Sequence, residues 1–170
     1  MNRLKWMERQ FRQENPIGVM PMVIERLLGT PARITEMTAG LSDTQLARAT
    51  EGNWSIKQHA GHLSDLESIH EGRIDDFLAR KEMLRAADMS NLRTNQAGHN
   101  DKAIGDIIAE FRTLRLAFVK RLRTLDDTTL EFQSLHPRLQ VPMRPIDIAV
   151  FTAEHDDHHL AIIRELMLGD

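Results

Sequence analysis

Residues 145–168 read PIDIAVFTAEHDDHHLAIIRELML, and this stretch decides the fold class. Pro145 suits the first turn of a helix, and Gly169 follows as a typical helix terminator. Between them, apolar and small residues recur at steps of four and three, the spacing of one buried helical stripe. The stripe comprises Ile148, Thr152, His155, His159, Ile162 and Leu166. The sequence therefore predicts a long helix whose buried face carries two histidines.

Three earlier segments show the same apolar spacing. Residues 21–41 form the first expected helix, with a kink at Gly29 and Pro31. Residues 55–85 form the second, opened by a capping box, and residues 100–125 form the third. Four helical segments without a convincing alternating strand predict an all-α four-helix bundle.

Shorter elements are expected between these helices. A short amphipathic helical arm is predicted over residues 1–15, and a brief helix over residues 42–49 behind a second capping box. Residues 86–100 lose the periodicity and collect Ser, Asn and Gly, which predicts an irregular connection. Residues 126–144 read as a linker with one helical turn at 127–131.

The composition narrows the class of protein. A length of 170 residues fits a single domain spanning residues 1–170. The net charge of -3 provides no field that would draw phosphate backbones, so nucleic acid is not expected as a partner. The chain begins without the apolar stretch of a signal peptide and has only short apolar runs. We therefore expect a cytoplasmic protein without a membrane partner.

The chain has no cysteine but eight histidines, so any metal must bind to His, Asp or Glu. His155 and His159 lie one helical turn apart and about 40° apart around the axis, which lets both reach one ion. Two buried imidazoles compete for the same hydrogen-bond partners, and a shared cation removes that conflict. The alternative is a pair of core histidines satisfied by carbonyls or carboxylates.

A third nitrogen ligand could come from the second predicted helix. His59 lies near the centre of its inward arc, with His62 and His70 on either side. The helical wheel slightly favours His59 over His62 and does not decide between them. Three histidine ligands would leave an open coordination position, as in catalytic metal sites.

Two other kinds of metal site fit less well. The stretch His155–His159 has Asp where a zincin motif requires Glu. A di-iron carboxylate bundle needs Glu-x-x-His on two helices, and only Glu67–His70 provides it. On the wheel, Glu67 and Asp156 point toward the flanks of their helices, so a dinuclear carboxylate site is not expected.

Three motifs in this order resemble the DinB/YfiT-like superfamily of metalloenzymes. They are NWSIKQHAGHLSDLE at 53–67, His136-Pro137, and EHDDHHL at 154–160. The resemblance covers essentially the whole chain, and it implies a four-helix bundle that binds one divalent ion, zinc or nickel. The ligands that it implies, in place of the His59 that the wheel favours, are His62, His155 and His159.

The resemblance also implies a class of function. Its members include thiol S-transferases that use bacillithiol, a mycothiol-dependent maleylpyruvate isomerase and proteins labelled metal-dependent hydrolases, and several are dimers. We therefore expect a metal-dependent thiol S-transferase or hydrolase of a small-molecule substrate. A low-molecular-weight thiol is the candidate cosubstrate, and a homodimer is the candidate assembly. The alternative is a non-catalytic bundle whose metal is structural or which serves protein association.

The sequence leaves the general base open. The candidates near the motifs are Asp65, Glu67, Glu154, Asp156 and His158, each of which could equally orient a ligand or face solvent. Arg73 lies on the inward arc beyond the motif, where it would meet an anionic substrate group or form a buried ion pair. Trp54 is expected to be a core anchor.

Overall fold

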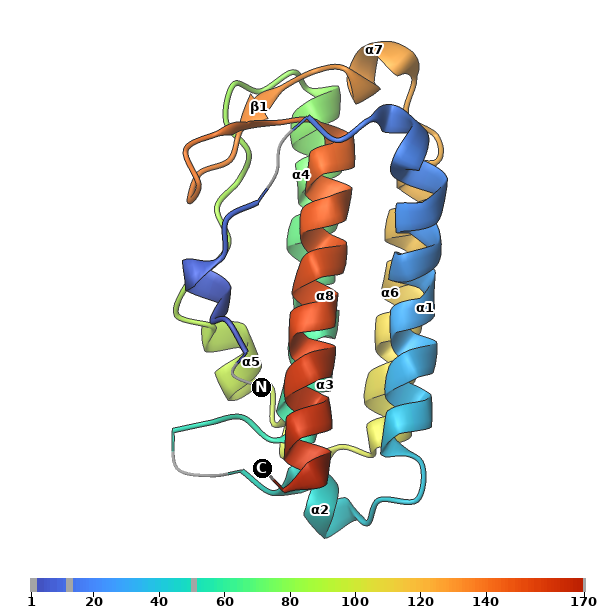
Figure 1. The fold of residues 1–170 in the computed structure, drawn as a ribbon, viewed down its shortest axis with the longest axis vertical. Helices are drawn as coiled ribbons and strands as arrows, with labels where there is room; N and C mark the ends of the chain where they lie inside the picture. The colour runs from blue at the N-terminus through green and yellow to red at the C-terminus, as the bar shows by residue number, and fades with distance from the viewer. Residues whose placement is uncertain (1–2, 12–13, 50–51, 170) are drawn as a thin grey trace.

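The computed structural model describes residues 3–11, 14–49 and 52–169, and its long helices form a four-helix bundle (Figure 1). These helices are α1 (Met20–Thr38), α3 (Ile56–Asp65), α4 (Glu67–Leu78), α6 (Ile104–Leu122) and α8 (Pro145–Leu168). Helix α1 packs against α6 and α8, and the consecutive pair α3 and α4 packs against the same two helices. The predicted all-α four-helix bundle is confirmed.

The predicted second helix is interrupted and ends early. Leu66 separates α3 from α4, although both helices continue in the same direction. Helix α4 ends well before the predicted end at Arg85, because Arg80 has a left-handed backbone (φ 53°) that cannot continue a right-handed helix. Beyond it, the N–H of Leu84 donates to the carbonyl of Leu135 (3.0 Å), so this segment pairs with the later linker.

Two predicted short helices are confirmed. Helix α2 (Asp43–Ala47) begins at the capping box of Ser42 and Gln45, in which the Gln45 N–H donates to the Ser42 hydroxyl (3.3 Å). The Ser42 N–H donates in return to the Gln45 side chain (2.9 Å), so the first turn is satisfied at both ends. Helix α7 (Asp127–Leu130) is the predicted turn within the linker.

Four short elements lie where the sequence predicted irregular chain. The expected connection at 86–100 contains α5 (Leu92–Gln96) and the start of the 3-10 helix η3 (His99–Asp101). The linker contains two antiparallel strands, β1 (Ser134–Leu135) and β2 (Pro142–Met143). Elements this short contain too few residues to show a periodic pattern in the sequence, and their conformation depends on contacts with segments that are distant in sequence.

The helical arm predicted over residues 1–15 is wrong for the residues that the structure describes. One turn of 3-10 helix, η1 (Trp6–Glu8), replaces it. Residues 1–2 and 12–13 of the predicted arm lie outside the described residues. A second 3-10 turn, η2 (Ile17–Val19), leads into α1.

The contacts of this N-terminal segment also differ from the predicted ones. The apolar spacing of the predicted arm places Leu4, Met7 and Phe11 on its packing face, but Leu4 and Met7 are exposed. Phe11 does face the bundle as predicted, together with Trp6, which the spacing did not predict: the Trp6 and Phe11 rings lie 5.0 and 4.8 Å from the ring of Phe151 on α8. The helical spacing fails here because an extended segment with one tight turn presents different residues to the bundle than a helix would.

Helix α1 continues through Gly29 and Pro31 without a break. Pro31 has no N–H to donate to the carbonyl of Leu27 one turn earlier. Arg115 of α6 supplies the missing donor, since its Nη1 lies 3.3 Å from that carbonyl. A neighbouring helix therefore satisfies the acceptor that the proline leaves open.

Arg115 also joins two carboxylates at the centre of the bundle. Its side chain is 1% exposed, and its Nε and Nη2 donate to Oε1 of Glu67 (2.9 and 2.7 Å). The same guanidinium binds both carboxylate oxygens of Asp156, which also accepts a hydrogen bond from Thr30 (2.8 Å). Burial raises the pKa of Glu67 to about 7, although Arg115 opposes the rise. Both carboxylates are buried although the sequence places them on helix flanks, because each helix packs against two neighbours and buries a wider arc than one stripe.

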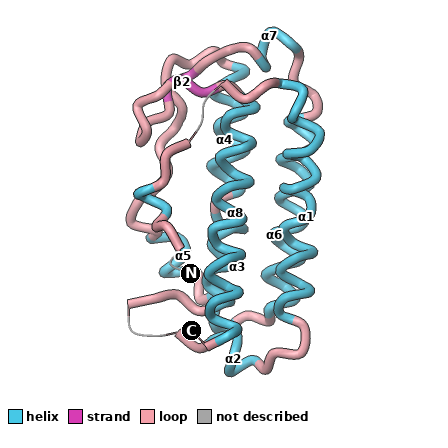
Figure 2. Tube along the Cα trace, in the orientation of Figure 1, coloured by secondary structure: helices cyan, strands magenta, loops and turns pink. Residues whose placement is uncertain are grey.

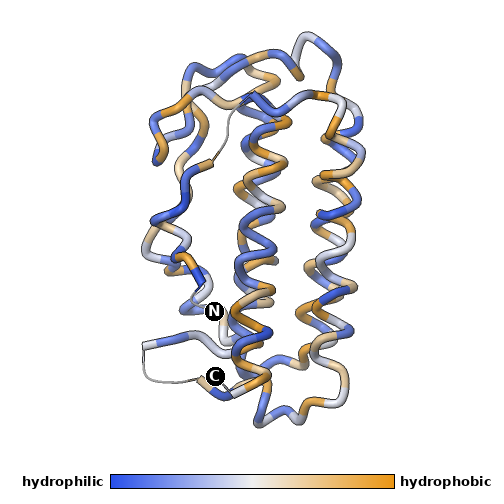
Figure 3. Tube along the Cα trace, in the orientation of Figure 1, coloured by the Kyte–Doolittle hydropathy of each residue, from blue (hydrophilic) through white to orange (hydrophobic). Residues whose placement is uncertain are grey.

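Among the described residues, two large apolar clusters lie on either side of this charged network along the helices, and a smaller third cluster includes Phe77, Met143 and Phe151. The members of the two large clusters include Leu27, Phe118 and Ile146 in one and Ile34, Phe111 and Ile163 in the other. Figure 3 shows apolar and hydrophilic positions alternating along the helices, as expected for amphipathic elements. None of the described helices combines the length and the apolar character needed to cross a membrane.

Replacing Arg115 with Met should lower the free energy of unfolding by about 3–5 kcal/mol, because two buried carboxylates lose their counter-ion. Urea unfolding followed by circular dichroism measures this change. The matched control is Arg123→Met on an exposed side chain of the same region, which should change stability by about 0.5 kcal/mol or less. Equal effects of the two substitutions would contradict the role given to Arg115.

Candidate metal centre

Three buried histidines from two helices meet inside the bundle. His62 comes from α3, and His155 and His159 come from α8. One nitrogen of each ring lies within 4.8 Å of the others. The Nε2 atoms of His155 and His159 are 3.2 Å apart. Two nitrogens bound tetrahedrally to zinc at about 2.0–2.1 Å would be about 3.3 Å apart, so the rings fit a shared divalent ion.

The residues that begin α3 set the direction in which His62 points. The Ser55 hydroxyl accepts the Gln58 N–H (3.1 Å), which begins α3 and sets its register. Trp54, just before this cap, lies with its ring 4.7 Å from that of His62 and donates from Nε1 to Asn95 (3.0 Å). Trp54 is partly exposed beside the histidines, so its predicted role as a core anchor is wrong.

A chain of hydrogen bonds orients the ring of His62. Thr94 donates its hydroxyl proton to Asp65 (2.9 Å), so it can only accept from the Nδ1–H of His62 (3.0 Å). This tautomer leaves the Nε2 lone pair of His62 free for an ion. His99 also bonds to Asp65 (2.9 Å), and Gly61 makes room for it, because a Cβ there would lie 2.4 Å from the His99 ring.

His59 lies beside the three converging rings and not among them. Its Nδ1 is 2.8 Å from Nδ1 of His159, so it can accept a hydrogen bond from the His159 Nδ1–H, the tautomer that leaves the Nε2 lone pair of His159 free. The geometry therefore does not follow the preference of the helical wheel for His59. His70, the third alternative, packs against Phe118, with ring centroids 5.5 Å apart.

Burial keeps these imidazoles neutral. It lowers the pKa of His59 to about 3 and that of His62 to about 4, with smaller effects from nearby charged groups. Burial and then the neighbouring histidines hold the pKa values of His155 and His159 well below the usual range. Neutral imidazole is the form that binds a metal, so the rings are ready to bind at neutral pH.

A cavity of about 660 Å³ opens from the three histidines. Figure 2 shows that the N-terminal segment and the connections around α5 and the strands gather along one side of the bundle, next to α8 and the α3–α4 pair. They supply Trp6, Ala86 and Arg138 to the wall, while α8 supplies Phe151. The floor is thus helical, and the opposite wall consists of loops.

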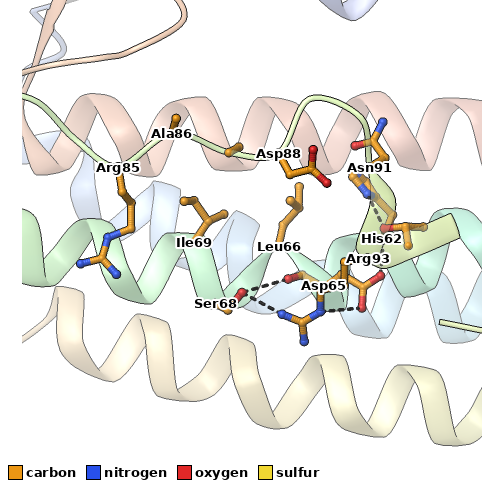
Figure 4. Close-up of a pocket in the computed structure, with 12 residues that line it drawn as sticks. His62, Asp65, Leu66, Ser68, Ile69, Arg85, Ala86, Asp88, Asn91 and Arg93 are labelled. Carbon is orange, nitrogen blue, oxygen red and sulfur yellow. Dashed lines mark hydrogen bonds and ion pairs between the residues drawn. The ribbon is translucent and has the colours of Figure 1, made fainter. Parts of the chain in front are cut away.

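A smaller cavity of about 220 Å³ shares the segment 86–91 with the larger one (Figure 4). Figure 4 shows Arg93 bonded to Ser68 and paired with Asp65, next to His62. These contacts hold the segment in front of the histidines.

The comparisons with known proteins agree with this architecture. Residues 26–163 match the family model described as the DinB superfamily. This chain belongs to the DinB superfamily. A solved structure, YfiT from Bacillus subtilis, superposes on this DinB chain with a TM-score of 0.74 and 22% sequence identity, over 93% of this chain and 91% of that chain. That protein is described as a probable metal-dependent hydrolase with an unusual four-helix bundle topology, and the likeness shows a shared fold. No curated protein matches the chain.

The four acidic base candidates of the DinB chain are engaged elsewhere. Asp65 accepts from Thr94 and His99, and Glu67 and Asp156 bind Arg115. The fourth pairs with two arginines: Glu154 binds Arg9 and Arg26. These carboxylates orient side chains or join elements, and none of them lines the larger cavity.

His158 is the base candidate that does line the larger cavity. Its Nε2 lies 3.4 Å from Arg3, and burial followed by Arg3 and Arg9 lowers its pKa to about 4. Among the described residues, the one carboxylate in the cavity wall is Asp88, which accepts hydrogen bonds from Ser90 and from the Leu92 N–H (2.8 Å). The cavity wall therefore offers no carboxylate free to take a proton.

Sequence reasoning missed several residues of this site. Thr94 and His99 lie in a stretch predicted to be irregular, and Trp6 was not assigned to the buried side of the arm. The Trp6 ring is 4.8 Å from that of His155, whose buried Nδ1 has no hydrogen-bond partner among the residues described. The signal available for Thr94 was only its polarity, because its partner is distant in sequence.

Replacing Thr94 with Val should weaken zinc binding about 10–100-fold, because His62 loses the acceptor that fixes its tautomer. Titration against a competing chromophoric chelator measures this affinity. Thr113→Val is the matched control, since that exposed hydroxyl donates to a carbonyl of its own helix (3.0 Å). Zinc affinity that is equal in the two variants would contradict the orienting role of Thr94.

Proposed function

We propose that His62, His155 and His159 hold one divalent ion, zinc or nickel, and that the chain is a metal-dependent enzyme acting on a small molecule. The observation that carries this proposal is three converging neutral imidazoles on the wall of a 660 Å³ cavity. Structural zinc sites usually close with four protein ligands, whereas the described residues provide three here. When bound, the ion would supply a Lewis acid that stabilises negative charge on a reacting oxygen or sulfur.

Thiol S-transfer is the reaction that the cavity favours. Among the described residues, the one carboxylate of the wall, Asp88, is engaged in hydrogen bonds, and His158, with its pKa near 4, is a weak base. A thiol has a pKa of about 8.5 and loses its proton far more readily than water does, so it needs less help from a side chain. The chain has no cysteine, and the sulfur nucleophile must therefore come from a low-molecular-weight thiol cosubstrate.

Hydrolysis is the second candidate. The description of YfiT as a probable metal-dependent hydrolase supports it, together with the position of His158 in the cavity wall. In either reaction the protein has the same tasks. Trp6, Trp54 and Phe151 exclude water from the site, and Thr94 and His59 orient the ligand rings. Homodimer formation stays a prediction.

His155→Ala and His62→Ala should each lose the metal ion, whereas His59→Ala should retain one ion per chain, because His59 does not join the converging nitrogens. Elemental analysis of untagged protein measures this content. Chelation should also lower the melting temperature of the wild type, since an ion bound only by the folded state stabilises it. One ion per chain in both His155→Ala and His159→Ala would overturn the ligand assignment.

Metal-loaded protein should consume a chromogenic electrophile only when bacillithiol, mycothiol or glutathione is present, and His155→Ala should abolish this turnover. Generic ester, amide and lactone substrates without thiol form the parallel arm. Turnover in that arm alone would favour hydrolysis over thiol transfer. A fully metallated protein that is inert in both arms, with its ion closed by four protein side chains in a crystal structure, would support the structural alternative.

A further inference from the structure

The end of the cavity away from the metal centre gathers positive charge. Arg73 of α4 and Arg138 of the linker line it together with His136. Arg73 lies about 16 Å beyond His62 along the α3–α4 direction, at the helical rise of 1.5 Å per residue. The apolar side chain of Ile69 lines the stretch between these two ends.

Neither arginine has an acidic partner in the described part of the chain. The nearest buried carboxylate, Asp76, is occupied by three hydrogen bonds from Arg85 and an ion pair with Lys81 (2.9 Å). The Nε of Arg73 donates to the carbonyl of Arg85 (3.4 Å), and Arg138 lies over the ring of Phe151, 5.8 Å from its centroid. The buried ion pair that was the alternative for Arg73 is therefore absent from the described residues.

Two buried polar atoms at this end are donors without acceptors among the described residues. His136 is 2% exposed, and its Nδ1 accepts the Leu139 N–H (3.2 Å), so its Nε2 carries the proton. That Nε2 and Nη2 of Arg138 are buried without a hydrogen-bond partner among the described residues. Unsatisfied buried donors are costly, and an acceptor with negative charge would satisfy them.

The charges at this end also disfavour one another. Burial, together with Arg138 and Arg85, lowers the pKa of Arg73 to about 10, although Asp76 opposes the change. Burial and the two arginines 73 and 138 lower the pKa of His136 to about 3. An anion placed here would remove the repulsion between the two guanidinium groups.

We propose that Arg73, His136 and Arg138 form a subsite for the anionic group of an elongated organic acid, whose apolar body lies along Ile69 and Phe151. The shared chemistry is that of a carboxylate, sulfonate or phosphate on an apolar chain or ring. The subsite deepens the proposed function, because it assigns a substrate class to the same cavity. Anion binding itself requires only the cationic end and no metal.

Two fluorescent probes test the subsite: anilinonaphthalene sulfonate and its uncharged parent, phenyl-naphthylamine. At low ionic strength the wild type should bind the sulfonate more tightly, and Arg138→Gln and Arg73→Gln should each weaken sulfonate binding about tenfold. Binding of the uncharged probe should stay within about twofold of the wild type. Arg123→Gln, at an exposed arginine outside the cavity, is the matched control and should change neither affinity.

Arg73 is buried, so Arg73→Gln could prevent folding, and circular dichroism detects that outcome. Arg138 is partly exposed, and Arg138→Gln then tests the subsite by itself. Sulfonate affinity that is unchanged in Arg138→Gln, or reduced equally in Arg123→Gln, would overturn the subsite. The same titration of His155→Ala separates the two proposals. If His155→Ala still binds the sulfonate more tightly than the uncharged probe, the anion lies at the cationic end. If this preference is lost in His155→Ala, the anion lies at the histidines and the subsite alone is overturned.

Failure of the wild type to bind metal would overturn the proposed function and leave this titration valid.

Discussion

The buried interaction of Arg115 with Glu67 and Asp156 is the constraint on which the rest of the structure depends. It joins α6 to α4 and α8 at the centre of the bundle. Arg115 also donates to the Leu27 carbonyl of α1, which Pro31 leaves without its usual N–H donor. Asp156 directly precedes the turn that carries His159. The guanidinium fixes that carboxylate, and His155 and His159 lie about 60–100° around the helix from it, facing the cavity.

The two halves of the cavity have different structural origins. The histidines stand on helices, whose packing holds side chains in fixed positions. The wall that faces them comes from the N-terminal segment, the stretch around α5 and the linker near His136. Loops tolerate substitution better than packed helices do. In the proposed function, this division separates the metal-binding side chains on the helices from the loops that carry Arg138 and Trp6.

The sequence predicted the long helices because each buries an apolar stripe over several turns. The pair His155 and His159 was readable for the same reason, since both stand on that stripe within one element. The third member of the histidine cluster was not readable in this way: the wheel slightly favoured His59 over His62, which lies about 60° away on the same helix. The family resemblance gave the set of histidines that the structure brings together.

By itself, the sequence determined what depends on neighbours along the chain: helix class, capping boxes, the inward histidine pair and the lack of any internal thiol. Tertiary structure alone decided whatever depends on partners distant in sequence. Thr94 reaches His62 from a separate segment, Arg115 draws Glu67 into the core, and Arg73 remains without a carboxylate because Arg85 and Lys81 occupy the nearest one. The physical reason is that the role of a polar side chain depends on the group with which it forms a hydrogen bond or ion pair. Helical periodicity predicts only whether that side chain is buried.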